Sequence, residues 1–577
     1  MASDIISALS LEAALWTAVA LVFTLLLVAI IERHWHMGKL QRLGYTGPQP
    51  NFLLGTLREF TKVSGEFPHG WQRIFDAYGS QVGDVKGKCL AMYMGRLPCI
   101  IVTDPDVIKT IAIREFDNFR NRMFCEVGKN RGVLAARDLA WKNARHTLAP
   151  AFSQAKMKHM SHAMNKSLSL TFDIIEEHIV DDKPVDVLRV FRGLTMEVIC
   201  KCGLGLEVNA QRKRQHPLLL SAIKIFEDYG YDNMKRLLIT LFPKFTTAVI
   251  NFFDLGFTPS ETAVLEYVKK VIHERMMSPQ TGKTVDALHF MMEAAQLIAT
   301  EDPDTASPAN GHARTNGRGV TKILCEKSHL NWFLKQDVAS NGLKEGLTNG
   351  KNAEQTKTKK PKLTTDEVAA NAFLLLLAGY ETTSAALAFT SYLLAKNPHV
   401  QQRLYEEISE HVKDEADLTY DMVGQLQYLD MVINESLRCY PPAGNVVTRE
   451  VDKDFEYRGL KFPAKSYVLL PIAYMHYNQD LWDDPTTFDP ERFHPDRKKD
   501  IHPAAFMPFG LGPRQCMGTR FALMEAKLAV SRLVMRFRLD VCSLTEMDLK
   551  TRASILILSP ASGKLYLRCY KRKDCTL

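Results

Sequence analysis

A glycine-rich segment near the C-terminus holds the side chains with the clearest chemical potential. Residues 509–518 read Phe-Gly-Leu-Gly-Pro-Arg-Gln-Cys-Met-Gly, and they include one thiol, Cys516, and one permanent cation, Arg514. Glycines let the backbone approach another group closely and adopt unusual φ angles. A helix predicted from Arg520 to Phe537 follows, and a helix N-terminus favours thiolate over thiol. The pattern fits a loop that presents a thiolate and a cation to a metal macrocycle bearing carboxylates. A structural loop with a core cysteine is the alternative.

A hydroxyl and a carboxylate, Thr382 and Glu381, sit side by side in a long apolar helix that is predicted over residues 365–396. Burying both groups is costly unless they act together. The pair therefore predicts a local distortion of the helix that carries a proton path. Two structural alternatives remain. Gly379 could admit a neighbouring helix, and the Thr382 hydroxyl could bond back to a carbonyl of its own helix.

Charged residues further along the chain predict a structural cluster. Glu435 and Arg438 lie three residues apart, on one face of a predicted helix. Most such pairs are exposed and contribute little, but the apolar context of residues 439–442 predicts burial here. The segment Phe488–Phe493 offers a second guanidinium, Arg492. A carboxylate held between two arginines would form a fixed structural knot.

Taken together, these motifs resemble the cytochrome P450 family. Residues 509–518 have the form FxxGxRxCxG of the haem-binding loop, with every specified position filled. The oxygen-activating helix motif, the ExxR motif and the arginine motif occur in the family's order, and Trp141 with Arg145 matches the WxxxR motif. The resemblance covers residues 45–572 apart from an insert. Two segments, 518–525 and 119–122, are most similar to the animal group that contains the drug- and steroid-oxidising family 3 enzymes and thromboxane synthase.

The resemblance implies a role for each of these residues. Cys516 would be the proximal metal ligand of haem b, iron protoporphyrin IX, whose thiolate favours O–O cleavage. Thr382 and Glu381 would hold water and relay protons to bound oxygen. Glu435, Arg438 and Arg492 would form the knot on the proximal side. The haem-binding residues would be Trp141, Arg145 and Arg514 at the propionates, Arg449 and Arg122 as further propionate partners, Phe509 beside the cysteine, and Gly510 and Gly518 in the loop.

The implied activity is that of a haem-thiolate monooxygenase, an oxidoreductase that acts on paired donors and incorporates molecular oxygen. It would hydroxylate or epoxidise lipophilic small molecules with O2 and with electrons that NADPH supplies through a cytochrome P450 reductase. Cytochrome b5 is a second candidate partner. The cofactor carries this chemistry, and the protein supplies the ligand, the pocket and the proton path. Two alternatives are a haem-thiolate isomerase of the thromboxane-synthase type and a non-catalytic haem carrier, and neither needs the Glu381–Thr382 relay.

The substrate pocket is expected to be mostly apolar, which favours a lipophilic substrate but names no compound. Its lining is expected from the segments Phe119 to Leu134, Ile225 to Phe257, Ala443 to Val447 and Ile555 to Ser559, and from Phe373 and Ala378.

Composition is that of a large globular protein. The 577 residues are 46% hydrophobic and 24% charged, with a net charge of +8, so the chain can bury a large core. The positive charge indicates an ordinary solvated surface or a basic face for an acidic protein partner. No basic run carries interleaved aromatic residues, so nucleic acid is not an expected partner. The eleven cysteines show no framework spacing, which is typical of a reducing compartment.

The N-terminal segment predicts a membrane anchor. The run from Ala13 to Ile31 carries no charge and is just long enough to span a hydrocarbon core. It lacks the basic start and small-residue cleavage site of a signal peptide. Basic residues follow it, namely Arg33, Lys39 and Arg42. The positive-inside rule then predicts that the chain beyond this single-pass anchor lies in the cytosol, and the resemblance implies that the membrane is that of the endoplasmic reticulum. A buried core helix is the alternative.

The elements that must position these groups are long predicted helices and short predicted strands, and the resemblance implies the cytochrome P450 fold, which is mainly α with small β-sheets. Residues 1–36 are the expected anchor, 37–60 a Pro/Gly hinge and 61–577 a single haem-thiolate domain, because the long apolar helix is long enough to cross a whole domain. Residues 301–362 are rich in polar residues and are expected to be disordered. Strands are predicted at Leu90–Met94 and Ile100–Val102, and helices at 141–180, 185–205, 260–276 and 284–299.

Overall fold

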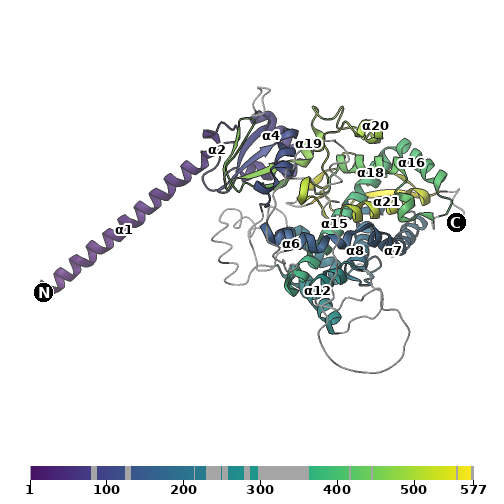
Figure 1. The fold of residues 1–577 in the computed structure, drawn as a ribbon, viewed down its shortest axis with the longest axis horizontal. Helices are drawn as coiled ribbons and strands as arrows, with labels where there is room; N and C mark the ends of the chain where they lie inside the picture. Colours follow the sequence, from purple (N-terminus) through teal and green to yellow (C-terminus); the bar gives the residue numbers. More distant parts are fainter. Residues whose placement is uncertain are drawn as a thin grey trace, which may run out of the picture. The chain divides into compact units, whose positions relative to one another are not determined.

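Helices dominate the fold, as the sequence predicts. The computed structural model describes residues 2–79, 87–123, 132–213, 215–228, 249, 258–277, 286–295, 363–414, 417–443, 446–553 and 557–572. In this part of the chain (Figure 1) the α-helices are α1 (Ala2–Met37), α2 (Lys39–Arg42), α3 (Leu57–Gly65), α4 (Gly70–Tyr78), α5 (Pro105–Lys109), α6 (Asp138–Leu148), α7 (Gln154–Val180), α8 (Val187–Leu204), α9 (Pro217–Asp228), α12 (Pro259–Met277), α13 (Ala287–Ala294), α15 (Thr365–Lys396), α16 (Pro398–His411), α17 (Tyr420–Val423), α18 (Gln427–Cys439), α19 (Ile472–Tyr477), α20 (Pro495–Lys498) and α21 (Thr519–Arg536). Shorter helical turns are η1 (Thr110–Arg114), η2 (Phe116–Asn118), η3 (Ala149–Phe152), η5 (Pro490–Phe493) and η6 (Gly512–Arg514).

Small sheets complete the fold within the described residues. The largest has the strand order β1–β2–β7–β4, and the others are β3–β11–β8, β10–β9 and β5–β6. The predicted strands around Gly95 are confirmed as an antiparallel pair in which Cys89 faces Val102 and Met94 faces Leu97. The strands are β1 (Cys89–Met94), β2 (Leu97–Val102), β3 (Val185–Asp186), β4 (Val447–Glu450), β5 (Phe455–Tyr457), β6 (Leu460–Phe462), β7 (Tyr467–Leu470), β8 (Phe537–Asp540), β9 (Thr551–Ala553), β10 (Leu558–Pro560) and β11 (Tyr566–Lys571).

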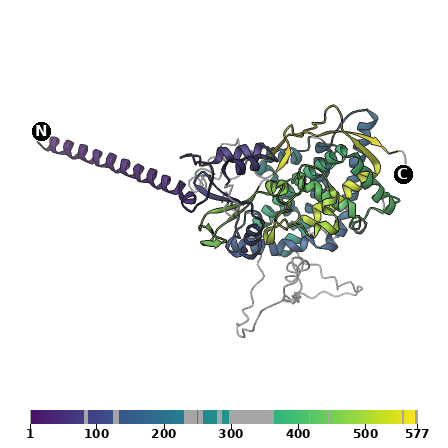
Figure 2. The same ribbon diagram turned by 90° about the horizontal axis from the view of Figure 1, so that it is seen from above.

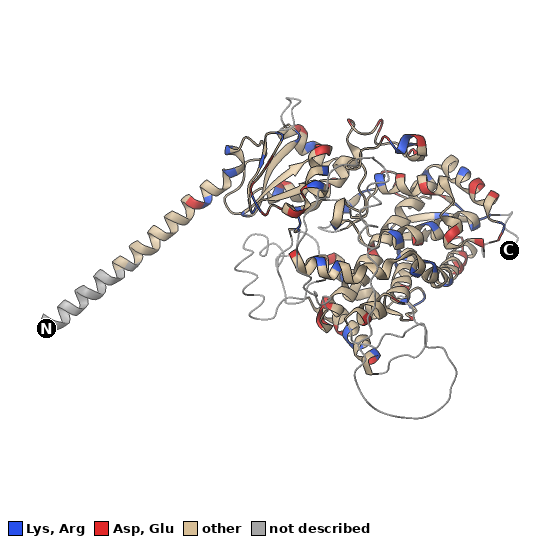
Figure 3. Cartoon of the chain, viewed as in Figure 1, with Lys and Arg blue, Asp and Glu red and all other residues tan. Residues whose placement is uncertain are grey.

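The predicted anchor segment forms helix α1. Its Val19–Met37 window is long and apolar enough to cross a membrane, and none of that window is buried inside the protein. In Figure 3 the charged residues drawn on α1 gather at the end that adjoins α2. Helix α15 passes the same test of length and composition, but 61% of its window is buried, as expected of a core helix.

Residues 37–60, predicted as a hinge, pack onto the first sheet. Leu40 is fully buried, and its amide donates a hydrogen bond to the Tyr93 hydroxyl (3.0 Å). A Cβ atom on Gly47 would lie 2.1 Å from the carbonyl oxygen of Ala91, so only glycine fits against β1 at this position. The stretch is therefore folded onto the domain.

Helix α15 is the central helix of the fold. Thr364 and Glu367 form the predicted capping box at its start. The helix packs extensively against α8 and also contacts α21, and Figure 2 shows this group of helices from a second direction. A Cβ atom on Gly379 would lie 2.7 Å from the Ile199 side chain of α8. Gly379 therefore lets α8 approach closely, which was one of the two structural alternatives for the motif.

Most of the other predicted helices are present with altered bounds. The helix predicted over 141–180 is divided into α6 and α7 by η3, because Pro150 lacks the amide that a continuous helix needs. Helices α8, α12 and α13 confirm the next three predictions within one to three residues where the chain is described. Helix α21 ends at Arg536, and Phe537 begins β8. The insert predicted at 301–362 lies outside the described residues.

Candidate active site

The glycine-rich loop closes on itself before α21. The amide of Cys516 donates to the carbonyl oxygen of Phe509 at 2.9 Å. Gly510 and Gly512 have φ angles of 77° and 73°, which side chains rarely adopt. A Cβ atom on Gly512 would also lie 2.0 Å from the carbonyl oxygen of Ala112. The two glycines therefore set the path of the backbone that presents Cys516.

The Cys516 side chain faces accessible space. The side chain is exposed, yet burial raises the pKa of its thiol. The Gly518 amide, the Thr519 hydroxyl, Arg145 and Arg122 all act to lower the pKa. These donors supply the effect predicted for a helix N-terminus, and burial opposes it. A metal ion at this position would favour the thiolate further.

Four arginine side chains gather beside this loop. Arg122 follows η2, Arg145 lies in α6, Arg449 in β4 and Arg514 in η6. Arg122 donates to the carbonyl oxygen of Arg514 (2.7 Å), and Arg145 donates to that of Gln515 (2.9 Å). Arg514 donates to three carbonyl oxygens, those of Arg120, Val133 and Ala136. The structure thus brings together all four arginines that the sequence identified, including Arg449.

The electrostatics of these four arginines are unfavourable in the chain alone. Burial and the charge of Arg122 lower the pKa of Arg514 to about 8 and that of Arg449 to about 9. Burial likewise lowers the pKa values of Arg122 and Arg145 to about 10. In the described part of the chain, no ion pair joins Arg122, Arg449 or Arg514 to a carboxylate, and the Nε of Arg449 has no hydrogen-bond partner. Such a cluster costs free energy unless an anion lies against it.

Trp141, predicted with this group, packs against one member of it. The Cζ atom of Arg514 lies 4.2 Å from the centroid of the Trp141 ring, and the ring is buried. This is the geometry of a cation–π interaction. Trp141 therefore helps to hold the Arg514 guanidinium in place.

One face of α15 is accessible although the helix is otherwise buried. Ala378 is exposed, and Thr382 and Ala386, one and two turns later, are half-buried. The Thr382 hydroxyl donates to the carbonyl oxygen of Ala378 at 2.6 Å. The helix runs without interruption from Thr365 to Lys396. The predicted local distortion is therefore wrong, because the hydroxyl bonds within a regular helix.

Glu381 is paired with an arginine for which the motifs predicted no role. Arg192 of α8 donates to both carboxylate oxygens, from Nε at 3.1 Å and from Nη2. Burial acts to lower the pKa of Arg192, but the Glu381 charge more than offsets it and the pKa is raised. A signal was present in the sequence. Arg192 falls on the same helix face as Leu188 and Thr195, which are buried, and a charge on a buried helix face needs a partner.

The predicted knot is confirmed on the neighbouring helix α18. Arg438 pairs with Glu435 through two contacts, Nε to Oε2 at 2.7 Å and Nη2 to Oε1 at 2.8 Å. The Nε of Arg492 lies 3.4 Å from Glu435 Oε1. The remaining donors of Arg438 bond to the carbonyl oxygens of His476, Pro485 and Thr487. The knot therefore joins α18 to the segment that precedes η5.

Much of the predicted substrate lining cannot be placed. Residues 124–131, 229–248, 250–257, 444–445 and 554–556 lie outside the described residues. Of the remainder, Phe373 is half-buried on α15 and Phe119 is fully buried among Phe455 and Phe462. Phe119 therefore belongs to a packed aromatic cluster.

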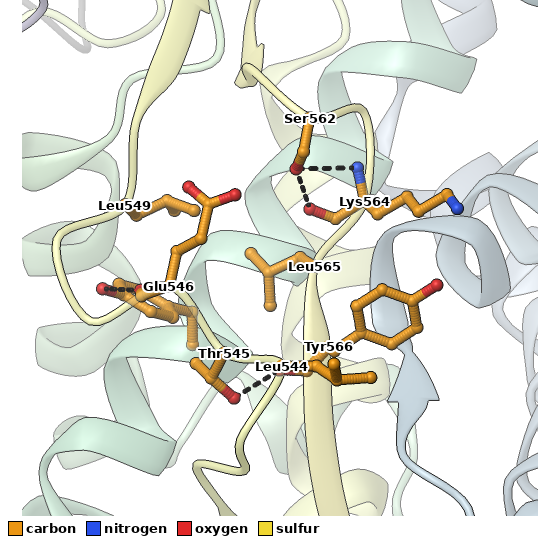
Figure 4. A pocket seen from close by; sticks show the side chains of 9 residues that line it. Leu544, Thr545, Glu546, Leu549, Ser562, Lys564, Leu565 and Tyr566 are labelled. Carbon is orange, nitrogen blue, oxygen red and sulfur yellow. Dashed lines mark hydrogen bonds between the residues drawn. The ribbon is translucent and has the colours of Figure 1, made fainter.

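A small pocket elsewhere in the fold contains none of the predicted site residues. Its volume is about 140 Å³, and it lies beside β11 (Figure 4). The Thr545 hydroxyl donates to the Tyr566 carbonyl oxygen at 2.7 Å on one side of it. Its lining is Tyr392, Leu544, Thr545, Glu546, Leu549, Ser562, Lys564, Leu565 and Tyr566.

Comparison with known proteins defines the class. The family model "Cytochrome P450" matches residues 46–315 and 335–567. The chain therefore belongs to the cytochrome P450 family. It is 29% identical to cytochrome P450 3A16 of Mus musculus over 560 residues, 96% of each chain. It is 30% identical to cytochrome P450 3A29 of Sus scrofa over 552 residues, which are 95% of this chain and 94% of the relative. The chain is thus a P450 monooxygenase, and haem-thiolate iron and the use of O2 follow from the family.

Proposed function

We propose that this chain is a membrane-anchored monooxygenase that hydroxylates or epoxidises lipophilic small molecules, with electrons that NADPH supplies through a separate cytochrome P450 reductase. The observation that carries the proposal is the Cys516 thiol beside four guanidinium groups, of which those of Arg449 and Arg514 are buried. One thiol and a cluster of cations with unmet charge fit a macrocycle that bears an iron ion and two carboxylates. The residues present therefore fit haem b.

Each candidate residue would have its own role in binding the haem. Cys516 would ligate the iron, and the Gly518 amide and Thr519 hydroxyl would donate to its sulfur. Phe509 would pack beside the ligand, and Gly510 would let the loop come close. The propionates would lie against Arg122, Arg145, Arg449 and Arg514, with Trp141 behind them. When bound, the haem supplies the activation of O2 for insertion into a C–H bond.

The accessible face of α15 would border the reaction space. The small side chains of Ala378 and Ala386 leave room above and below Thr382. The Thr382 hydroxyl can give up its bond to the Ala378 carbonyl and hold a water molecule instead. We assign Thr382 and Glu381 the movement of protons into this space, as general acid groups.

The N-terminal residues and the net charge support a membrane location and protein partners for the domain. Helix α1 would cross the endoplasmic reticulum membrane once, and Arg33, Lys39 and Arg42 would hold the domain on the cytosolic side. The net charge of +8 favours docking of an acidic reductase, with cytochrome b5 as a second partner. A lipophilic substrate partitions into the same membrane, so it meets the enzyme at high local concentration.

The test is turnover of the full-length protein with NADPH and reductase, in membranes, on a panel of lipophilic substrates. The ratio of product formed to NADPH oxidised is compared between wild type and Thr382→Ala. We expect substrate binding to change little and more NADPH to end as hydrogen peroxide. General acid groups contribute about 100- to 10,000-fold, and water substitutes in part, so the loss of product should fall at the lower end.

A matched control lies two turns further along the same helix. The Thr390 hydroxyl also bonds back, to the carbonyl oxygen of Ala386 at 2.8 Å, but it is buried in the core. Thr390→Ala should leave the product-to-NADPH ratio at the wild-type value. An unchanged ratio in Thr382→Ala would contradict the proton role. Product formed without NADPH or reductase would instead favour an isomerase of the thromboxane-synthase type.

A further inference from the structure

His476 is a fully buried histidine near the end of α19, a helix that packs beside α18 (Figure 1). The Nδ1 atom of the His476 ring lies 3.1 Å from the carbonyl oxygen of Arg438. That carbonyl is one of the last in α18, and the last carbonyl groups of a helix lack partners within it. The Nε2 atom accepts a hydrogen bond from the amide of Met507 at 3.1 Å. The ring therefore joins α18 to the segment that precedes the Cys516 loop.

The two partners fix the protonation state of the His476 ring. A carbonyl oxygen only accepts hydrogen bonds, and a backbone amide only donates them. The Nδ1 atom must therefore carry the ring proton, and Nε2 must offer its lone pair to Met507. Burial, followed by the charge of Arg438, lowers the pKa of His476 to about 3. The ring is thus neutral, with one tautomer that satisfies both partners.

Hydrogen bonds continue from Met507 into the loop that presents Cys516. The Met507 carbonyl oxygen accepts from the Gly510 amide at 2.9 Å, and the Phe509 carbonyl oxygen accepts from the Cys516 amide at 2.9 Å. Residues 506–511 belong to no helix or strand, so no regular element fixes where the loop begins. The bond from the Met507 amide to His476 ties that beginning to the core.

Aromatic packing holds the His476 ring in place. The ring of Phe506, the residue before Met507, lies 5.4 Å from it, centroid to centroid, with 29° between the planes. Phe506 in turn packs against Phe493 of η5 at 4.6 Å. Stacking of this kind favours one orientation of each ring. The His476 ring is therefore a rigid spacer between α18 and the loop.

We propose that His476 is a positioning residue for the haem ligand, because it fixes Met507 relative to the Glu435–Arg438 knot and so fixes the loop that presents Cys516. The inference rests on the proposed role of Cys516 as the iron ligand. Both side chains of the knot are fully buried, and Nη1 of Arg438 also donates to the His476 carbonyl oxygen at 2.8 Å. His476 is thus held at its backbone and at its ring. Groups that hold a metal ligand in place from outside the coordination shell contribute strongly to metal binding.

Two substitutions separate the two bonds of the ring. In His476→Gln the longer side chain can still accept from the Met507 amide. In His476→Asn the shorter side chain can donate to the Arg438 carbonyl oxygen but does not reach Met507. A buried amide left unpaired changes an equilibrium constant about tenfold to a hundredfold. We therefore expect His476→Asn to lose thiolate ligation about tenfold to a hundredfold faster than wild type, and His476→Gln to stay close to wild type.

The measurement uses full-length protein with haem bound. The red-shifted band of the ferrous carbon monoxide complex is followed with time at a fixed elevated temperature, and its loss reports loss of the thiolate. Far-ultraviolet circular dichroism of the same samples reports helix content. In His476→Asn the band should disappear before the helix content falls. A merely structural role would make the two signals fall together.

The matched control is Tyr477→Phe, at the next residue of α19. The Tyr477 hydroxyl donates to the Cys439 carbonyl oxygen at 2.8 Å, so this change also removes one hydrogen bond between α19 and α18. That bond does not involve the loop. Tyr477→Phe should therefore lose the band no faster than it loses helix content.

Hydrogen–deuterium exchange of the haem-bound proteins locates the change. Peptides that contain the Met507 and Gly510 amides should exchange faster in His476→Asn than in wild type, and peptides of α18 should exchange at the wild-type rate. If His476→Asn does not fold, Phe506→Leu removes the stacking and keeps both hydrogen bonds of the ring. It should speed loss of the band to a smaller extent, again ahead of helix content.

The outcomes separate this inference from the proposed function. A wild-type protein without the red-shifted band would remove the proposed role of Cys516. With the band present in wild type, the role of His476 is overturned if band and helix content fall together in His476→Asn, or in Phe506→Leu where that variant stands in. Equal rates of band loss in His476→Asn and His476→Gln would also overturn it, because the bond to Met507 would then have no effect on the ligand.

Discussion

Arg449 and Arg514, which come from distant parts of the chain, are both buried, and burial followed by the charges of Arg122 and Arg449 lowers the pKa of Arg514. Arg449 comes from β4 and Arg514 from the turn before Cys516. Strand β4 delivers Arg449 to the cluster. Like charges gather in this way where a bound anion compensates them.

Arg514→Leu tests this arrangement through two opposite effects. In the haem-free protein the change removes one of four repelling charges, but it also leaves the carbonyl oxygens of Arg120, Val133 and Ala136 without their donor, so the loss of stability should be partly offset. Haem binding should weaken, because a charge-assisted hydrogen bond contributes about 1.5 to 3 kcal/mol, or about tenfold to a hundredfold in affinity. The measurements are the rate of haem transfer to an excess acceptor protein and the thermal unfolding of the haem-free form.

A nearby arginine with its own carboxylate is the control for that prediction. Arg137 pairs with Glu450 of β4, and its side chain is 26% exposed. Arg137→Leu should lower stability without a comparable change in the rate of haem loss. If Arg514→Leu loses haem no faster than Arg137→Leu, the guanidinium cluster is not the propionate site.

Cys516→His should abolish the red-shifted absorption band of the ferrous carbon monoxide complex. That band depends on a thiolate donor, and an imidazole donates less electron density to the iron. Haem content is measured in parallel, so that loss of the band is separated from loss of the cofactor. Cys542→Ser, at a partly exposed thiol beyond β8, should keep the band. Retention of the band in Cys516→His would remove the central claim.

The sequence predicted those parts of the site in which the chemistry needs particular residues at short spacing. Each of these motifs is short. The Cys516 loop, the Glu435–Arg438 pair and the Thr382–Glu381 pair each occupy a stretch of ten residues or fewer. The burial of α15 followed from its composition, because a helix that is apolar all round needs protein on every side. These inferences required no knowledge of which elements pack together.

The pairing of Arg192 with Glu381 could not be predicted in the same way. The two residues are 189 positions apart, and no local rule states which buried carboxylate an arginine on α8 will meet. The continuity of α15 was missed for a different reason. A back-bonding threonine and a distorted helix have the same sequence, and only the structure, with its unbroken helix and the bond from Thr382 to the Ala378 carbonyl oxygen, decides between them.

Gly512→Ala should damage the loop far more than Gly459→Ala does. Both glycines have positive φ angles, 73° and 76°, so both substitutions carry a backbone strain of about 1 to 2 kcal/mol. Only at Gly512 would the new Cβ atom meet the protein, 2.0 Å from the Ala112 carbonyl oxygen, whereas Gly459 has open space around it. The difference in thermal unfolding and in haem content between the two variants measures the clash alone. Equal losses would show that strain, and not close packing, selects glycine at position 512.

Because Glu525 is buried without a partner among the described residues, we expect the free energy of unfolding to depend on pH in an unusual way. It lies in α21, it is 1% exposed, and neither carboxyl oxygen has a hydrogen-bond partner among the described residues. Burial raises its pKa well above the ordinary value of 4.5. The folded chain therefore keeps this proton at a pH where the unfolded chain has lost it. Stability from this group is fully present below pH 4.5 and is lost as the pH rises toward the folded pKa.

Glu525→Gln isolates this effect, because glutamine has nearly the same shape and no titrating proton. Over the range in which only the unfolded chain is ionised, wild type should lose about 1.4 kcal/mol of unfolding free energy per pH unit relative to the variant. The variant should consequently be the more stable protein at neutral pH. Denaturant unfolding of both proteins between about pH 5 and pH 8 measures the difference. Glu410→Gln, at an exposed position on α16, is the control and should run parallel to wild type. A Glu525→Gln profile that also runs parallel to wild type would show that Glu525 is ionised in the fold and has found a partner there.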